Sequence, residues 1–213
     1  MINLFKILKN EKWKLLFLFF IFFTTTGIYG YDLSDFGDFS SRSIIMNKLN
    51  NQSPMTQEQR DLLVSKKLTP TSECLFVQSK KGNYDNVKLL LEAKVNPNQS
   101  YMSEFPIYIA AKENHFEVVK LLYEYNAKLD RGFYSELYEA IRNKNQEMAQ
   151  WLIDKGARVN YIDSITNNTI LYLSLKNNMY DISTQLISKG AKADMRSVKY
   201  IKKKKLINLI PDK

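Results

Sequence analysis

Residues 104–122, EFPIYIAAKENHFEVVKLL, contain two short helical patterns separated by a turn. Pro106 suits the first turn of a helix, where its missing N–H would have no partner in any case. The Ile and Ala residues that follow form an apolar stripe, and Asn114 tolerates the left-handed conformation that ends a helix. Glu117 then begins a second helix, where its charge lies near the positive end of the helix dipole. Val and Leu residues form the apolar stripe of this helix. The stretch therefore predicts two antiparallel helices joined by a tight turn.

The same unit returns along the chain at intervals of 32, 30 and 34 residues. Two columns of residues keep these unequal intervals independently of each other, which chance does not produce. The columns are Phe76, Tyr108, Tyr138 and Tyr172, and Leu89, Leu121, Trp151 and Gln185. Fixed-period copies of a helical unit predict a solenoid, in which each copy packs on the next.

The second unit resembles an ankyrin repeat. Residues 105–111, FPIYIAA, stand where that family has Thr-Pro-Leu-His-x-Ala-Ala, and Asn114-His115 stand for its Gly-His. Four such units, at about 72–103, 104–133, 134–167 and 168–194, cover over half of the chain. The resemblance implies an all-α ankyrin-repeat solenoid of helix-turn-helix units, which binds a protein partner and has no catalytic activity.

Several residues depart from the family pattern. The family's His position holds Phe or Tyr in all four units, so a Tyr hydroxyl is expected to replace an inter-repeat hydrogen bond, which Phe76 cannot do. Lys144 occupies the turn position that Gly82 and two Asn residues hold in the other units, which predicts modest strain there. His115 is expected to have a structural role at its turn.

The N-terminal segment resembles a targeting sequence. Residues 1–14 contain four lysines, and residues 15–23 (LLFLFFIFF) are an unbroken apolar run. This order predicts a signal peptide over residues 1–30 or an uncleaved N-terminal anchor; either would place the repeats outside the cytoplasm. Residues 31–54, rich in Ser, Asp and Asn, are expected to form a flexible linker.

Both ends of the repeat array are expected to be capped. Within residues 55–71, Thr56 and Gln59 predict a capping box at the start of a short helix that ends near Lys67, with Leu62 and Leu63 on its apolar face. Residues 195–213 predict a basic closing helix, which carries the cluster Lys202–Lys205.

Two sets of residues are candidates for partner contacts. The first, called the basic column below, keeps the repeat spacing near the end of each first helix: Lys80, Lys112, Arg142 and Lys176. Cations near a helix C-terminus are also favoured by the helix dipole, so this column has a structural explanation as well. The second set comprises residues of the inter-repeat loops, where aromatic side chains are favoured interface anchors. These are Tyr101, Met102, Phe133, Tyr134 and Tyr161. The alternative is that these side chains pack against neighbouring loops.

Composition limits the function further. The single Cys74 and single His115 provide neither an intrachain disulfide nor a Cys/His metal cluster, and no phosphate-binding Gly-rich loop is present. We therefore expect no cofactor and no enzymatic activity. The net charge of +9 favours acidic partners. The expected protein is a monomer that binds a protein; the alternative is an electrostatic adaptor for an acidic membrane surface or, less favoured, nucleic acid.

Overall fold

The computed structural model describes residues 55–204. These residues all belong to one compact unit of the chain, and they contain ten helices and no strand. The predicted signal peptide or anchor at residues 1–30, the predicted linker at 31–54 and the end of the predicted closing helix at 205–213 lie outside the described residues.

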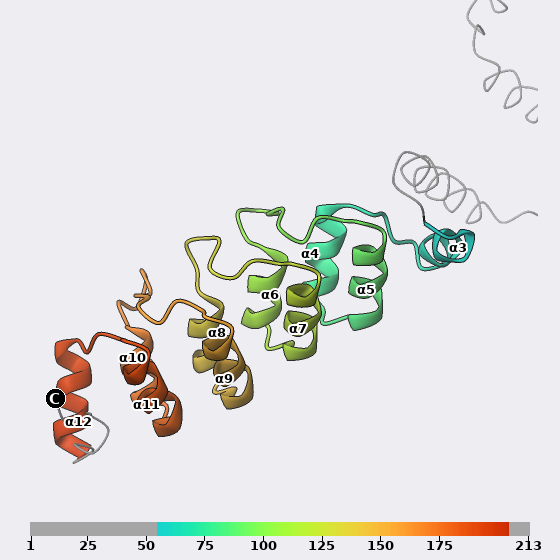
Figure 1. Cartoon of the computed structure of the whole chain (residues 1–213). Coiled ribbons are helices and arrows are strands. Elements are labelled where there is room, and N and C mark those ends of the chain that lie inside the picture. Colours follow the sequence, from blue (N-terminus) through green and yellow to red (C-terminus); the bar gives the residue numbers. More distant parts are fainter. Residues whose placement is uncertain (1–54, 205–213) are drawn as a thin grey trace, which may run out of the picture. The chain divides into compact units, whose positions relative to one another are not determined.

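Four helix pairs follow one another between residues 72 and 188 (Figure 1). The first helices of the pairs are α4 (Ser72–Lys80), α6 (Pro106–Lys112), α8 (Glu136–Arg142) and α10 (Ile170–Lys176). The second helices are α5 (Tyr84–Glu92), α7 (Phe116–Glu124), α9 (Gln146–Asp154) and α11 (Tyr180–Ser188). The fold is thus the all-α solenoid that the repeated pattern predicted.

The first helices form one row and the second helices another (Figure 1). In the first row α4 packs on α6, α6 on α8 and α8 on α10; in the second, α5 packs on α7 and α9 on α11. The core between the rows is made of the predicted apolar stripes, with Leu90, Leu122, Leu152 and Leu186 all fully buried. The connecting loops project on the side of the first helices (Figure 1).

Left-handed residues end every helix of the four pairs. At the turn inside each pair, the positive φ angles are 70° at Gly82, 64° at Asn114, 57° at Lys144 and 59° at Asn178. The prediction for Asn114 is confirmed, and Lys144 does adopt the left-handed conformation that its side chain disfavours. After each second helix, the left-handed residues are Lys94, Asn126, Gly156 and Gly190.

Helices cover both ends of the described array. Helix α3 (Gln57–Ser65) begins with the predicted capping box of Thr56 and Gln59, and it buries Leu63 completely. The prediction for Leu62 was wrong, since this side chain is 42% exposed, although the adjacent Leu121 and Leu122 of α7 are both buried. At the other end α12 (Met195–Lys204) packs on α10 and buries Ile201, while Lys202 to Lys204 are exposed.

Candidate functional site

Four apolar side chains, spaced about one repeat apart along the chain, are largely exposed. The most exposed apolar residue of each of the three inter-repeat loops belongs to this set, and the first residue of α12 is the fourth; the third loop also exposes Ile162, by 57%. The exposed fractions are 78% for Met102 and 89% for Phe133, Ile165 and Met195. These four residues are called the loop-tip row below. Because water contacts almost all of each side chain, their burial adds nothing to the stability of the fold.

Two members of the loop-tip row were missed by sequence reasoning. Ile165 and Met195 are not aromatic, so they were not selected when aromatic loop residues were taken as the candidate anchors. A signal was available in the spacing, since the four residues are separated by 31, 32 and 30 positions, close to the repeat period.

The predicted loop tyrosines pack inward. The Tyr101 ring lies 5.4 Å from that of Phe76, and its hydroxyl donates to Glu73 at 3.0 Å. Tyr134 stacks on Tyr108 with 4.8 Å between ring centroids and is 39% exposed. Tyr161 packs edge-on against Tyr138 and is only 9% exposed, so it offers little surface to a partner. Of the predicted aromatic candidates, Phe133 is therefore the most available.

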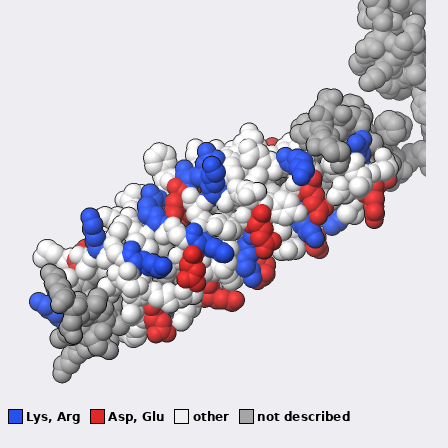
Figure 2. All heavy atoms as spheres, viewed as in Figure 1, with Lys and Arg blue, Asp and Glu red and all other residues white. Residues whose placement is uncertain are grey.

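The basic column is half neutralised within the protein. The Lys112 ammonium lies 3.0 Å from Glu104, and the Arg142 Nε lies 2.6 Å from Glu139. Lys80 and Lys176 are exposed and form no ion pair with any residue in 55–204. On the face seen in Figure 2, basic and acidic side chains are interspersed, and no continuous basic stripe is formed.

The junction between the second and third helix pairs differs from its neighbours. At the junctions on either side, an Asn side chain bridges two loops. Asn98 accepts from the N–H of Lys128 and donates to the Asn126 carbonyl. Asn160 accepts from the N–H of Lys192 and donates to the Gly190 carbonyl. The equivalent residue at this junction is Asp130. Its Oδ2 accepts from the Arg158 N–H at 2.6 Å, but a carboxylate cannot donate the second bond.

A buried carboxyl lies at the same junction. Glu136 begins α8 at the position that Pro106 has in α6, and it is only 2% exposed. Its Oε2 accepts from the Asp130 N–H at 3.1 Å. Burial raises the pKa of Glu136 to about 7, and the Asp130 carboxylate adds to the increase, while its hydrogen bonds and Arg158 oppose it. The junction thus contains a carboxyl that titrates near neutral pH.

The repeated helix pairs agree with a comparison to protein families. Residues 75–163 match the family model described as ankyrin repeats (3 copies). These residues form ankyrin repeats. The fourth helix pair, α10 and α11, continues the same architecture beyond the matched residues. No curated protein matches the chain.

The ankyrin array uses tyrosine where the family has histidine, as the sequence predicted. The Tyr108 hydroxyl donates to Glu139 of the next repeat at 3.0 Å, and Tyr138 shares a hydrogen bond with Thr166 at 3.0 Å. Glu139 is buried, and the pKa of its carboxyl is raised by loss of solvent, although Arg142 and Tyr108 oppose the increase. The tyrosine and the glutamate therefore satisfy each other across the repeat interface.

His115 joins two neighbouring ankyrin repeats. Its Nε2 lies 3.0 Å from the carbonyl oxygen of Lys80, and its ring packs closely under Gly82. A Cβ on Gly82 would lie 2.5 Å from the His115 Nδ1, so the tight turn and the histidine ring fit only because the glycine has no side chain. The predicted structural role of His115 is confirmed.

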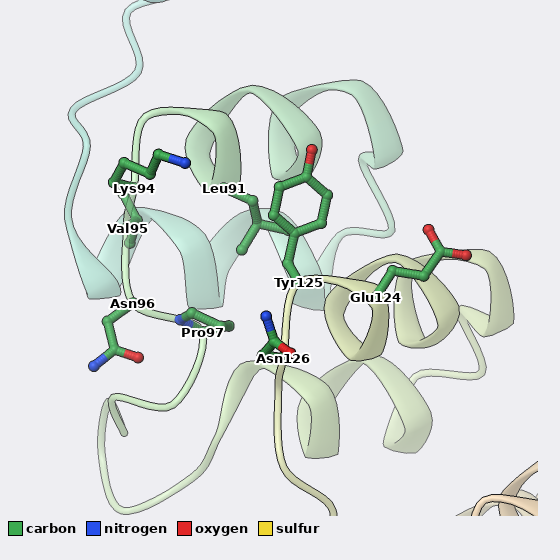
Figure 3. A pocket seen from close by; sticks show the side chains of 8 residues that line it. All are labelled: Leu91, Lys94, Val95, Asn96, Pro97, Glu124, Tyr125 and Asn126. Atoms are coloured by element: carbon green, nitrogen blue, oxygen red, sulfur yellow. The ribbon is translucent and has the colours of Figure 1, made fainter. Parts of the chain in front are cut away.

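A pocket of about 320 Å³ lies between the C-terminal ends of α5 and α7 in the first two ankyrin repeats (Figure 3). Its charged lining residues are Lys94 and Glu124, which Figure 3 places on different sides of the opening, and its other lining residues are apolar, amide or Tyr125. No Cys, His or Ser lines it, so nothing in its lining favours nucleophilic catalysis.

Within residues 55–204, no group of three or more His, Cys, Asp or Glu side chains is placed to hold a metal ion. None of the helices in this part of the chain has the length and apolar character needed to cross a membrane. Ankyrin repeats support protein–protein interaction.

Proposed function

We propose that this chain is a non-catalytic protein-binding module, exported or tethered to a membrane, which contacts its partner through the loop-tip row. The observation that carries the proposal is the exposure of four apolar side chains that recur at about the repeat spacing. Each is 78% or more exposed. Loops can change without cost to the stacked helices, so exposed apolar residues placed there serve binding rather than folding.

The partial neutralisation of the basic column supports a protein partner over a polyanion. Phosphate-dominated binding depends on several cations that act together, and each one adds to the salt dependence. Only Lys80 and Lys176 of the column have no carboxylate partner in the described structure. An electrostatic adaptor would have to rely on these two residues and the Lys202–Lys204 end of α12, where the lysines are exposed.

Export or tethering is proposed from residues 1–30 alone. By the positive-inside rule, the lysines that precede the apolar run support an orientation with the repeats outside the cytoplasm in both cases. The intact mass and N-terminal residue of the protein from its native cell would test this. A chain that begins near Tyr31 would indicate a cleaved signal peptide, and one that keeps Met1 in the membrane fraction an anchor. An intact chain in the cytosol would refute both.

A triple variant of the loop-tip row is expected to bind its partner at least about 100-fold more weakly, because exposed anchors carry most of the affinity of an interface. The three changes are Met102→Ser, Phe133→Ser and Ile165→Ser. The thermal midpoint should change little, since these side chains bury almost no surface. The measurement is the Kd of the purified partner for the full-length chain by calorimetry, together with thermal unfolding followed by circular dichroism.

The matched control is Leu62→Ser, which removes an exposed apolar side chain from α3, outside the loops. Binding by this variant should equal that of the wild type. If the triple variant binds normally, while Lys80→Glu with Lys176→Glu or 200 mM salt abolishes binding, the electrostatic alternative is correct and the proposal fails.

A further inference from the structure

Three aromatic side chains gather between α7 and α9, in the row of second helices. The centroid of the Trp151 ring lies 5.1 Å from that of Tyr123 and 5.8 Å from that of Phe116, and the ring is close to perpendicular to both, at 80° and 75°. All three side chains are partly buried, so each ring keeps part of its surface in contact with solvent. These three residues are called the aromatic corner below.

The packing of the repeats does not require these rings. Trp151 stands in the column that holds Leu89 and Leu121 in the first two repeats, and both of these leucines are buried. At the position of Tyr123, the next repeat has Ile153, which is also buried. An aliphatic side chain is therefore sufficient for the core at both positions. Aromatic residues that keep an exposed surface in their place indicate a role in binding.

An ammonium group already lies in the aromatic corner. The Lys155 Nζ is 5.6 Å from the centroid of the Tyr123 ring and 5.7 Å from that of Trp151, so it lies over both rings at once. The Lys120 Nζ is 4.6 Å from the centroid of Phe116. At such distances the negative face of an aromatic ring attracts a cation. The two lysines thus show that these rings accept a cationic group.

Carboxylates around the aromatic corner add to this preference for cations. Glu117 pairs with Lys120 at 2.7 Å, and this bond, with the nearby carboxylates of Glu147 and Glu124, raises the pKa of the Lys120 ammonium, although loss of solvent opposes the increase. Glu124 and Glu147 are exposed and form no ion pair with any residue in 55–204. Their negative charges attract a cationic ligand and repel an anionic one.

We propose that the aromatic corner binds a trimethylammonium group, which takes the place of the Lys155 ammonium. Because a lysine ammonium is strongly hydrated, it competes weakly for the rings, whereas a trimethylammonium group is poorly hydrated and contacts them with its methyl groups. Lys155 is exposed, so its flexible chain returns to water when the ligand enters. The inference goes beyond the proposed function, since the site lies on the second helices and not in the loops.

The test measures binding of choline to the full-length chain by saturation-transfer NMR, read on the methyl signal of the ligand. Choline is expected to bind with a Kd of about 1 mM. Its neutral analogue, in which a carbon atom replaces the nitrogen, has the same shape without the charge and should bind at least about 10-fold more weakly. Equal binding of the two compounds would mean that only apolar contact is involved, and it would overturn the inference.

Two lysine variants locate the site. Lys155→Ala removes the internal competitor, so the affinity for choline should rise about 2- to 5-fold. The matched control is Lys189→Ala. Lys189 follows α11 as Lys155 follows α9, is exposed, and lies over no ring within the described residues, so this change should leave the affinity unaltered. Equal affinities of the two variants would contradict the proposed place of the ligand.

Trp151→Leu removes one wall of the site and introduces the residue that this column has in the first two repeats, so the variant should fold. It should bind choline at least about 10-fold more weakly, while the triple variant of the loop-tip row should bind choline as the wild type does. Undiminished binding by a folded Trp151→Leu variant would refute the site. Nε-trimethyl-lysine is titrated in parallel: tighter binding than choline would indicate a methylated protein as the source of the group, and weaker binding a choline headgroup.

Discussion

At pH 8, Glu136→Gln is expected to increase the free energy of unfolding by up to about 3 kcal/mol. The folded-state pKa of this carboxyl is about 7 instead of its ordinary 4.5, and such a difference corresponds to about 3 kcal/mol. At pH 8 the wild-type protein therefore keeps a charge in a site that is 2% exposed. The glutamine has nearly the same shape, can still accept from the Asp130 N–H, and carries no charge. Its buried NH2 group faces N–H donors and lacks an acceptor among the bonds of this site, so about 3 kcal/mol is the upper limit of the gain.

The sign of the pH dependence follows from the raised pKa. Below pH 4.5 the carboxyl is protonated in both folded and unfolded chains, so its contribution is fully present there. Between pH 4.5 and 7 the folded state holds a proton that the unfolded state has lost, and stability falls as pH rises through this window. Burial also raises the pKa of Glu139, which acts in the same direction.

Urea unfolding of both proteins between pH 5 and pH 8 measures this effect. The difference between wild type and Glu136→Gln should grow from pH 5 to pH 8. As a control, Glu113→Gln changes an exposed carboxyl and should alter stability by less than about 0.5 kcal/mol. Equal pH slopes for Glu136→Gln and the wild type would show that Glu136 is not the responsible group.

Replacing Gly82 by Ala is expected to reduce the free energy of unfolding by about 2–3 kcal/mol. The alanine would have to adopt a φ of 70°, which costs about 1 kcal/mol. Its Cβ would also lie 2.5 to 2.8 Å from three atoms of the His115 ring. The ring would have to move and give up its contact with the Lys80 carbonyl, at a further cost of about 1 kcal/mol or more.

A double-mutant cycle with His115→Ala separates the two causes. In the absence of the ring, Gly82→Ala should cost only the backbone strain of about 1 kcal/mol, so the two changes should be strongly non-additive. Chemical denaturation of the four proteins provides the measurement. Additive effects would mean that the glycine is needed only for its backbone conformation.

The sequence predicted those features that depend on neighbours along the chain. The helix pairs, the capping box of Thr56 and the left-handed Asn114 follow from residues within a few positions of each other. The contacts between repeats join residues about 30 positions apart, and the sequence pattern does not show which side chains meet. The hydrogen bond from Tyr108 to Glu139 and the bond from Asn143 to the Ala111 carbonyl therefore became visible only in the structure.

The candidate surface was predicted only in part, for a similar reason. The repeat spacing predicted where the loops lie in the sequence. It did not predict that the Tyr101 ring packs on Phe76 and that the Tyr134 ring stacks on Tyr108. Whether a loop side chain packs or projects depends on the space beside the neighbouring first helix, which composition does not reveal. Phe133 and Tyr134 are adjacent aromatic residues, yet their exposed fractions are 89% and 39%.

The substitution of Asp130 for the bridging asparagine has a consequence for how the array comes apart. In a repeat stack each unit contacts only its neighbours, so cooperativity is transmitted one interface at a time. The interface at Asp130 lacks one inter-loop hydrogen bond and contains the titratable Glu136. The contacts that hold it closed are the ion pair of Asp130 with Arg158, the hydrogen bond of Tyr108 with Glu139 and the packing of Trp151 on Phe116. Opening here would release two blocks of two helix pairs each. In an array opened at this interface, the loop between α7 and α8 would be the segment accessible to a protease.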